Sequence, residues 1–275
     1  MMILHCGNIP LDLTAPRIMG ILNVTPDSFS DGGQHFHIES AVEHALQLIE
    51  EGAAIIDIGG ESTRPGAPAV PVQQELDRVL PVLMALQGCG AILSVDTRQP
   101  EVMVSAIAAG AHMINDIDAL QAKAALQTVA DGNVAVCLMH KRGEPQQMQI
   151  DPRYQDVVGE VKDFLAARIA AAMEAGIARE RIVVDPGFGF GKSLTHNLKL
   201  LRHLDRITLL GVPVLAGISR KSMLGKITGR AVDQREYAGL AAQVLAVMRG
   251  VRILRVHDVA ACRDALKIIQ AVEEQ

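Results

Sequence analysis

Tryptophan is absent from this sequence, and aromatic residues make up only 3% of its 275 residues. Small aliphatic residues, mainly alanine, valine, isoleucine and leucine, must therefore supply a core from the 49% of residues that are hydrophobic. Such residues suit parallel β-strands that are covered on both faces. We therefore expect a large core in which helices cover buried parallel strands.

Long apolar runs and basic blocks are also missing. No apolar stretch approaches the roughly 18 residues that suggest a membrane-spanning helix, so we expect no membrane association. The first residues, MMILHCGNIPLD, lack the basic segment and long apolar run of a signal peptide. The formal net charge is -5, and no block is rich in lysine and arginine, so we expect no nucleic-acid partner.

Cysteine is scarce and scattered. The four cysteines, Cys6, Cys89, Cys137 and Cys262, are far apart in the sequence, and no Cys-x-x-Cys pair occurs. This distribution favours reduced structural thiols over a zinc site or a disulfide framework. Together with the missing signal peptide, it predicts a cytoplasmic protein.

Short β-branched runs alternate eight times with alanine- and leucine-rich stretches of helical period. Alternation of this kind predicts a parallel sheet, and eight repeats predict an α/β fold of the (β/α)8 TIM-barrel type. Such a barrel needs about 250 residues, so we expect a single domain over 1–275. An open doubly wound sheet is the alternative. The expected strands are Arg17–Val24, Ala54–Gly59, Ala91–Asp96, His112–Ile117, Val134–Met139, Arg181–Asp185, Pro213–Ser219 and Arg252–His257.

Capping signals set the expected ends of several helices. Ser40 and Glu43 have the spacing of a capping box, and Gly52 is placed to end the helix that they begin. Pro100 suits the first turn of another helix, which Gly110 would end. Helices over 235–249 and 259–272 complete the pattern.

Polar residues end nearly every expected strand, often directly after an apolar run such as ILSVD (Ile92–Asp96). Wet loops explain polar residues in general, but they explain poorly why Asn or Asp recurs as the last residue of a buried run. The carboxyl ends of barrel strands meet at one mouth, so these side chains are expected to line one pocket. The three long irregular segments, 26–39, 60–73 and 140–152, follow strands on the same side.

The expected pocket combines two kinds of chemistry. Asp96, Asn115 and Asp185 offer acceptors for a ring rich in N–H donors, such as an aminopyrimidinone. Asn23 is a neutral oxygen ligand of the kind that Mg²⁺ accepts beside phosphate and water. The cationic side chains that suit a phosphate or carboxylate are Arg64, Lys221, Arg255 and His257.

Two patterns suggest sites that closer inspection excludes. The run DPGFGFGKS (Asp185–Ser193) looks like a phosphate-binding loop, but Pro186 stands where that motif needs glycine. Lys192 likewise replaces the third glycine of the dinucleotide motif. These glycines instead predict a tight turn that lets the backbone and Phe190 approach a ligand. His35 and His37 have no third ligand nearby, so we expect no metal there.

Eight motifs, in order between Ile18 and Val259, resemble those of the dihydropteroate synthases. They are MGILNVTPDSFSDGG (Met19–Gly33), IDIGGESTRPGA (Ile56–Ala67), SVDT (Ser94–Thr97), INDI (Ile114–Ile117), LMH (Leu138–His140), DPGFGFGKS (Asp185–Ser193), ISRKSMLG (Ile218–Gly225) and RVHDV (Arg255–Val259). The family has a (β/α)8 barrel, which agrees with the eight strands expected from the sequence pattern.

The resemblance implies a reaction of folate biosynthesis. Such enzymes condense 6-hydroxymethyl-7,8-dihydropterin diphosphate with 4-aminobenzoate, release diphosphate, form 7,8-dihydropteroate and are the targets of sulfonamides. The resemblance also implies Mg²⁺ as cofactor, small-molecule substrates and a homodimer. Diphosphate can leave first, giving a cationic methylene on the pterin that the weakly basic aniline attacks without a strong general base. Closed loops would keep water from capturing that cation.

The resemblance also implies roles for individual residues. The pterin-binding set is matched by Asp96, Asn115, Asp185 and Lys221, and the Mg²⁺ ligand is matched by Asn23. The contacts to the diphosphate substrate are matched by Thr63, Arg255 and His257, and the aminobenzoate pocket by Phe29, Pro65, Phe190 and Ser222. Two loops that close over the site carry Asp31 and Arg64, which with Lys221 are the expected catalytic residues. Lys221 has a second interpretation as a plain salt-bridge partner. Asp118 and Lys141-Arg142 depart from the family pattern, which leaves the surface around them undefined.

Three other functions compete with this prediction. A pterin-binding methyltransferase that passes a folate methyl group to a corrinoid would share the barrel, but it would not need the loops after the first two strands in this form. An aldolase using Lys221 as a Schiff base would need a desolvated amine, and Lys221 lies among Arg and Ser. A non-catalytic pterin-binding scaffold would gain nothing from so many charges at the mouth.

Overall fold

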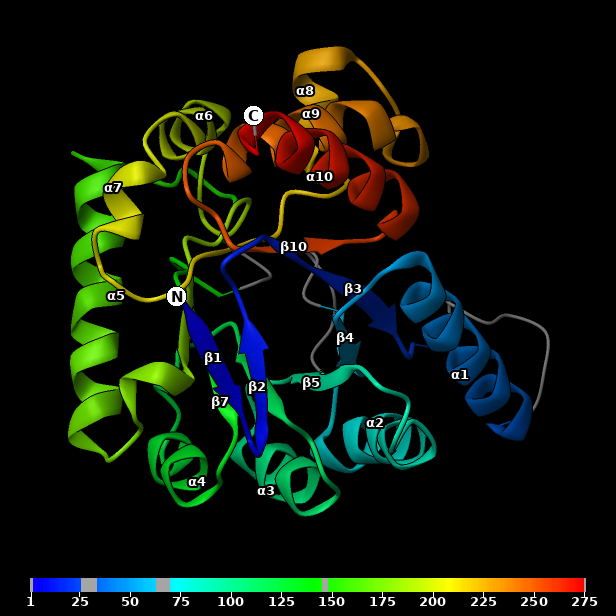
Figure 1. Cartoon of the computed structure of the whole chain (residues 1–275). Helices are drawn as coiled ribbons and strands as arrows, with labels where there is room; N and C mark the ends of the chain where they lie inside the picture. The colour runs from blue at the N-terminus through cyan, green and yellow to red at the C-terminus, as the bar shows by residue number, and fades with distance from the viewer. Residues whose placement is uncertain (1, 26–33, 63–69, 145–147, 275) are drawn as a thin grey trace.

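The computed structural model describes residues 2–25, 34–62, 70–144 and 148–274. Eight parallel strands form one sheet in the order β8-β7-β6-β5-β4-β3-β10-β9. A parallel bridge between Val184 and Val214 joins β8 to the segment before β9 and closes the barrel (Figure 1). The TIM barrel is therefore confirmed over the open sheet. The strands are β3 Arg17–Asn23, β4 Ile55–Gly59, β5 Ile92–Asp96, β6 Met113–Asp116, β7 Ala135–Met139, β8 Ile182–Asp185, β9 Leu215–Ala216 and β10 Ile253–Val256.

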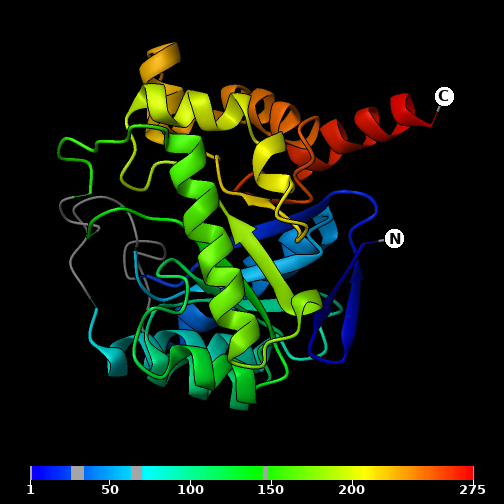
Figure 2. The same ribbon diagram turned by 90° about the vertical axis from the view of Figure 1, so that its left-hand side faces the viewer.

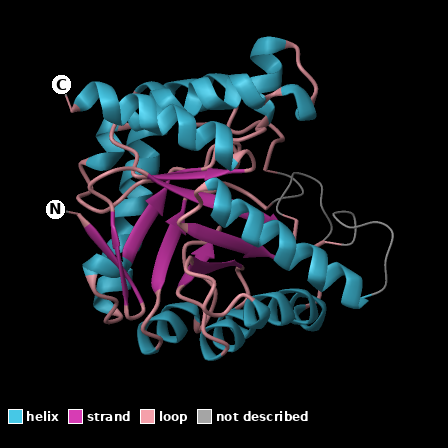
Figure 3. Cartoon of the chain, turned by 45° about the vertical axis from the view of Figure 1, so that its right-hand side comes forward, coloured by secondary structure: helices cyan, strands magenta, loops and turns pink. Residues whose placement is uncertain are grey.

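Helices surround the sheet on its outer face (Figure 3). They are α1 Gln34–Glu51, α2 Val72–Ala85, α3 Pro100–Ala108, α4 Ala125–Asp131, α5 Val157–Glu174, α6 Leu194–Arg202, α7 Asp205–Thr208, α8 Ser222–Thr228, α9 Glu236–Val247 and α10 Val259–Glu273, with 3₁₀ turns at Arg179–Arg181 and Val232–Gln234. Within the described residues, no helix combines the length and apolarity needed to cross a bilayer.

Side chains alternate between the two faces of each strand, and this alternation divides the core in two. Outward residues such as Ile56 and Leu93 pack with the helices in one large apolar cluster. Inward residues such as Ile55 and Ile92 form a second cluster inside the barrel. Two residues further along these strands, the same face carries Asp57 and Ser94. The barrel interior is therefore apolar where the strands begin and polar where they end.

A hairpin that the sequence pattern did not predict closes the apolar end of the barrel. Strands β1 (Ile3–Cys6) and β2 (Ile9–Asp12) pair antiparallel. Leu4 and Leu13 are fully buried in the interior cluster with Met19. Figure 2 shows the hairpin beside the end at which the barrel strands begin, so the polar end remains the candidate site.

The predicted helix ends are partly wrong. Helix α1 already begins at Gln34, so Ser40 lies inside it and forms no capping box with Glu43. Its backbone N–H can bond within the helix, so it needs no side-chain cap. Helix α3 does begin at Pro100, and Gly110 follows its end with φ of 93°. All four cysteines, which lie within the described ranges, are free, as predicted.

Candidate active site

Asp57, near the end of β4, is the centre of a buried polar network in the barrel. Its side chain is fully buried. Its Oδ1 accepts a 2.6 Å hydrogen bond from Ser94 Oγ, and its Oδ2 accepts one of 2.9 Å from Asn115 Nδ2. Arg255 Nε also donates to Asp57 Oδ2, at 2.6 Å. The sequence pattern places Asp57 inside the expected strand Ala54–Gly59 and gives it no role, although alternation from the buried Ile55 could have placed it inside the barrel.

Arg255 of β10 joins the network to a second carboxylate. Its Nη2 donates to Asp96 Oδ2 at 2.7 Å. Burial raises the pKa of Asp96 to about 7, and the positive charge of Arg255 opposes that rise. Burial alone would lower the pKa of Arg255, but the charges of Asp57 and Asp96 outweigh it and hold the pKa above its ordinary value. The predicted ring-binding residues and Arg255 thus belong to one connected site.

Asp185 ends β8 at the opposite side of the same interior. It is 5% exposed, and its Oδ1 accepts a 2.7 Å hydrogen bond from the backbone N–H of Gly187. Burial raises its pKa; the Gly187 hydrogen bond and the charges of Lys221, Lys192 and Arg255 oppose this. A desolvated carboxylate that is held only partly by the protein is suited to bind N–H donors of a ligand.

The tight turn predicted after Asp185 is confirmed. Gly187 and Gly191 have φ of +69° and +64°, in the left-handed region that favours glycine. A Cβ at Gly187 would overlap the carbonyl oxygen of His140, and one at Gly191 would overlap that of Arg142. The glycines are therefore needed because the turn presses directly on the segment that follows β7.

Phe190, on this turn, and Lys221 form one wall of the site. Lys221 Nζ lies 4.2 Å from the centroid of the Phe190 ring, which is a cation–π contact. Lys221 directly precedes α8, so Ser222 is the first residue of that helix. Phe190 is 7% exposed and packs with Ile117 and Met139. An aromatic face beside an ammonium can pack on and pair with an aromatic carboxylate.

His257 and Asn23 also lie at the ends of their strands. His257 Nδ1 is 3.0 Å from Ser219 Oγ, and its backbone N–H donates to the same oxygen. Asn23 pairs in register with Gly59 of β4, which pairs with Asp96 of β5. Among the described residues, no group of three or more His, Cys, Asp or Glu side chains could hold a metal ion. A metal at Asn23 would need most of its ligands from substrate phosphate and water, which is the coordination that Mg²⁺ favours.

Five of the predicted site residues cannot be placed. Phe29, Asp31, Thr63, Arg64 and Pro65 lie outside the described residues. The structure brings together Asp96, Asn115, Asp185, Lys221, Phe190 and Arg255. Their assigned roles remain predictions.

The two departures from the family pattern are partners of each other. Lys141 Nζ lies 2.5 Å from Asp118 Oδ1. Arg98 joins the pair to Glu61, with Nε 3.2 Å from Glu61 Oε2, and Glu144 lies within 3.6 Å of Lys141. These side chains tie together the segments that follow β4, β5, β6 and β7. Neither charge is therefore an isolated surface feature.

Comparisons with known proteins identify the family of the chain. The family model described as pterin binding enzyme matches residues 19–257. A dihydropteroate synthase of Escherichia coli is 48% identical over 262 residues, which are 95% of this chain and 93% of that protein. Two structures of Xanthomonas albilineans dihydropteroate synthase are also similar. The one with 4-aminobenzoic acid is 56% identical, covers 98% of both chains and has a TM-score of 0.93. The one with 7,8-dihydropteroate is 50% identical, covers 99% of both and has a TM-score of 0.88. The chain therefore belongs to the dihydropteroate synthase family of pterin-binding enzymes.

Proposed function

We propose that this protein condenses 6-hydroxymethyl-7,8-dihydropterin diphosphate with 4-aminobenzoate to form 7,8-dihydropteroate and diphosphate. The observation that carries the proposal is the pairing of two surfaces in one site. A floor of acceptors, the buried Asn115 and Asp185 with Asp96, whose side chain is 10% exposed, lies beside a wall formed by Phe190 and Lys221. A relative with 4-aminobenzoic acid and another with 7,8-dihydropteroate support the same pair of substrates.

The floor suits a pterin ring because the ring offers hydrogen-bond donors and the floor offers acceptors. An aminopyrimidinone ring offers N–H donors, and the carboxylates of Asp96 and Asp185 accept them. Asn115 already donates to Asp57 through its Nδ2, so its Oδ1 is oriented as an acceptor. Positive charge that develops on the ring as diphosphate leaves is stabilised by the buried carboxylates. The floor therefore binds the substrate and favours its ionisation.

The diphosphate side combines Arg255, His257 and Asn23, with Thr63 expected to join them. Asn23 would hold Mg²⁺, which would neutralise negative charge on the diphosphate as it leaves. Arg255 links both halves because its guanidinium also pairs with the floor carboxylates. Attack by the aniline nitrogen then depends more on the correct placement of 4-aminobenzoate and the exclusion of water than on a general base. Phe190, Ser222 and Lys221, with Phe29 and Pro65, are the residues proposed to place it, and Asp31 and Arg64 are proposed to act from the closing loops.

One assay tests the reaction directly. The purified protein is incubated with the pterin diphosphate, 4-aminobenzoate and Mg²⁺, and the products are separated by chromatography. Dihydropteroate and diphosphate in equal amounts are the expected result. A folded protein that forms no dihydropteroate while both substrates stay intact would contradict the proposal. Methyl transfer from methyltetrahydrofolate to a corrinoid in a parallel assay would support the alternative instead.

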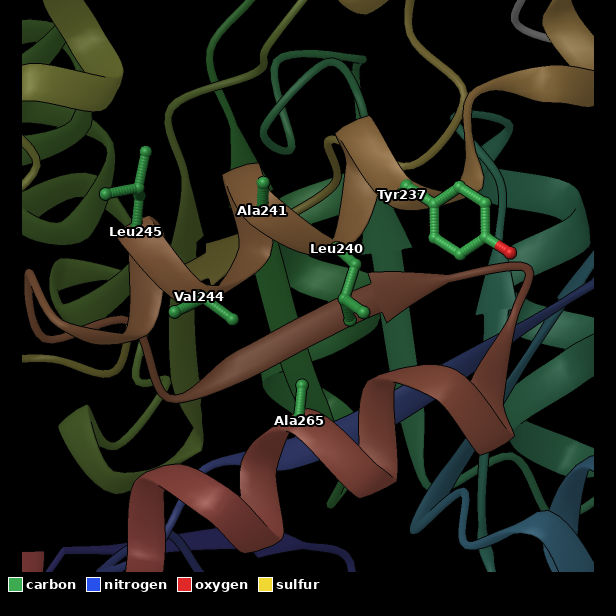
Figure 4. Close-up of a pocket in the computed structure, with 6 residues that line it drawn as sticks. All are labelled: Tyr237, Leu240, Ala241, Val244, Leu245 and Ala265. Atoms are coloured by element: carbon green, nitrogen blue, oxygen red, sulfur yellow. The ribbon is translucent and has the colours of Figure 1, made fainter. Parts of the chain in front are cut away.

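We also propose a cytoplasmic homodimer. An apolar groove between α9 and α10 is lined by Tyr237, Leu240, Ala241, Val244, Leu245 and Ala265 (Figure 4). Tyr237 is 82% exposed, and Met248 and Ile268 beside this groove are also exposed. A patch of this kind marks an interaction surface, and the family resemblance supports a second copy of the chain as the occupant.

Light scattering after size exclusion tests the dimer. Wild type is expected at twice the chain mass, and Leu245→Glu is expected to shift it toward the monomer. Leu209→Glu is the matched control, because Leu209 is an exposed leucine that follows α7, outside the groove. A monomeric wild type, or equal effects of both variants, would contradict the proposal.

A further inference from the structure

Lys192 is a buried lysine to which the proposed reaction gives no role. Burial lowers its pKa to about 7, and the charge of Asp185 opposes that fall. The Lys192 side chain is only 2% exposed, and it follows the glycine turn after β8. Its Nζ donates to the carbonyl oxygens of Gly187 at 2.8 Å and Phe190 at 3.0 Å. The carbonyl oxygen of His140 accepts from it at 3.2 Å, and the Nδ1 of the same residue lies 2.9 Å away.

His140 completes the surroundings of the ammonium as a neutral ring. Burial, followed by the charge of Lys192, lowers the pKa of His140 to about 3. Its Nδ1 is then free to accept a hydrogen bond. An ammonium has three N–H donors, and four acceptors lie around it. Lys192 therefore fastens the inside of the turn to the end of β7, with no donor left over for a ligand.

The outside of the same turn is held by other groups. Asn197 Oδ1 accepts a 2.8 Å hydrogen bond from the backbone N–H of Gly189, and Tyr154 donates to the carbonyl oxygen of Gly191 at 3.0 Å. Only Lys192, among these side chains, bonds the carbonyl of Phe190. Without the ammonium, the buried carbonyl of Phe190 would lose its donor, and that of Gly187 would keep only the 3.1 Å bond from the backbone N–H of Phe190, so the turn would have to move to regain a donor.

The floor of the site touches this turn where the backbone N–H of Gly187 donates to Asp185 Oδ1, but strand pairing sets the position of its three residues. Asp96 and Asn115 pair in register between β5 and β6, and Asp185 pairs with Met139 of β7. Phe190, in contrast, lies on the turn itself, and Lys221 lies against its ring. Loss of the ammonium should therefore disturb the wall of the pocket much more than its floor.

We propose that Lys192 is a positioning residue, which fixes the glycine turn and thereby holds Phe190 and Lys221 as the wall that receives the aromatic amine substrate. The inference rests on the proposed function, because it assigns that wall to 4-aminobenzoate. Its signature is selectivity: the second substrate should be affected, and the pterin should not.

The test compares Lys192→Met and Lys192→Gln with wild type. Lys192→Met is expected to raise the KM for 4-aminobenzoate about tenfold or more, the effect of losing buried hydrogen bonds. Lys192→Gln keeps N–H donors at a shorter reach and is expected to give a smaller rise. The Kd of pterin-6-carboxylate, measured by titration calorimetry, is expected to change less than about threefold, which is near the low end of the effect of one lost hydrogen bond.

Arg181 provides a matched control at the other end of the barrel. It too is a buried cation surrounded by carbonyls, since Nε donates to Val134 O at 2.7 Å and Nη2 to Val129 O at 2.6 Å. Arg181→Met should lower the melting temperature, as Lys192→Met should, but it should leave the KM for 4-aminobenzoate unchanged. The comparison separates loss of stability from loss of position.

Each outcome decides the proposal. An unchanged KM in both Lys192 variants overturns it, and so does an equal loss of pterin and 4-aminobenzoate binding. If Lys192→Met does not fold, the rise in KM expected for Lys192→Gln decides alone. A wild type that makes no dihydropteroate defeats the proposed function instead, and the pterin-6-carboxylate titration still shows whether the floor is correctly assigned.

Discussion

Arg255 Nε and Asp57 Oδ2 are 2.6 Å apart inside the barrel, although β3 lies between their strands in the sheet. The carboxylate is fully buried, and the Arg255 side chain is 20% exposed. Two strands that share no backbone hydrogen bonds are thus joined by a desolvated ion pair. The same Asp57 oxygen accepts from Asn115, so the pair also orients a floor residue.

Asp57→Ala is expected to be strongly destabilising. It leaves Arg255, Ser94 and Asn115 without their shared acceptor, and breaking a buried pair costs about 3–5 kcal/mol. Urea unfolding measures the loss. Asp151→Ala is the control, because Asp151 pairs with Arg153 at the surface, where both side chains are more than 60% exposed. A loss as small as that of the control would show that the network contributes little to stability.

Asp185→Asn is expected to keep the barrel folded and to lose most of its affinity for the pterin. The amide is nearly the same size, but it replaces a charged acceptor with a neutral group, and hydrogen bonds to charge contribute about 1.5–3 kcal/mol. A rise of about tenfold to hundredfold in the Kd of pterin-6-carboxylate should follow. Circular dichroism checks the fold. Unchanged binding would place the pterin elsewhere.

Most of the barrel could be predicted from the sequence because parallel strands that are covered on both faces leave a strong local pattern. All eight strands lie where β-branched runs predicted them, although β9 is only Leu215–Ala216. The β1–β2 hairpin was missed because each strand has only four residues and its burial depends on the barrel that it closes. Ser40 misled because a capping pattern inside a longer helix has no local mark that distinguishes it.

The sequence predicted which residues belong to the candidate site but not the contacts that join them. Asp96, Asn115 and Asp185 could be found because each ends an apolar run. The role of Asp57 depends on Arg255, 198 residues later in the chain, and no local signal links them. Lys192 was noticed only as a mismatch to the dinucleotide motif, since its three carbonyl partners become neighbours only when the glycine turn folds back on His140.

Asp118 and Lys141 are expected to stabilise each other. Their side chains are 20% and 8% exposed, and the charged atoms are 2.5 Å apart. A double-mutant cycle with Asp118→Asn and Lys141→Met should give a coupling of about 1–2 kcal/mol, in the range for partly buried contacts. The Asp151–Arg153 pair, measured in the same way, should couple by less than about 1 kcal/mol. Equal coupling free energies for the two pairs would mean that burial does not strengthen the Asp118–Lys141 ion pair.

Glu75 of α2 is expected to make stability fall as the pH rises. Its side chain is fully buried and packs against the backbone of Gly60, which lies in the segment that follows β4. Neither of its carboxylate oxygens has a hydrogen-bond partner among the described residues. Burial raises its pKa from 4.5 to about 7, although the nearby Thr97 hydroxyl opposes the rise. Between these two values the folded protein keeps a proton that the unfolded chain has lost. By linkage, the free energy of unfolding then decreases as the pH increases through this window.

Glu75→Gln isolates this effect, because glutamine is neutral at every pH and nearly the same size. Asp116, whose pKa burial also raises, titrates in both proteins and cancels in the difference. Asp96 cancels less completely, because the charge of Glu75 contributes to its raised pKa. Urea unfolding at pH 5, 6, 7 and 8 should show Glu75→Gln gaining on wild type by up to about 3 kcal/mol, the free-energy equivalent of the shift. Most of the gain should appear below pH 7. Above the pKa of about 7, Glu75 is ionised in the folded protein as well, so the stability difference between the two proteins should grow only slightly. A difference that stays constant from pH 5 to 8 would show that Glu75 is ionised in the fold throughout, and the charge would then have to be balanced by Arg78 and Arg98 nearby.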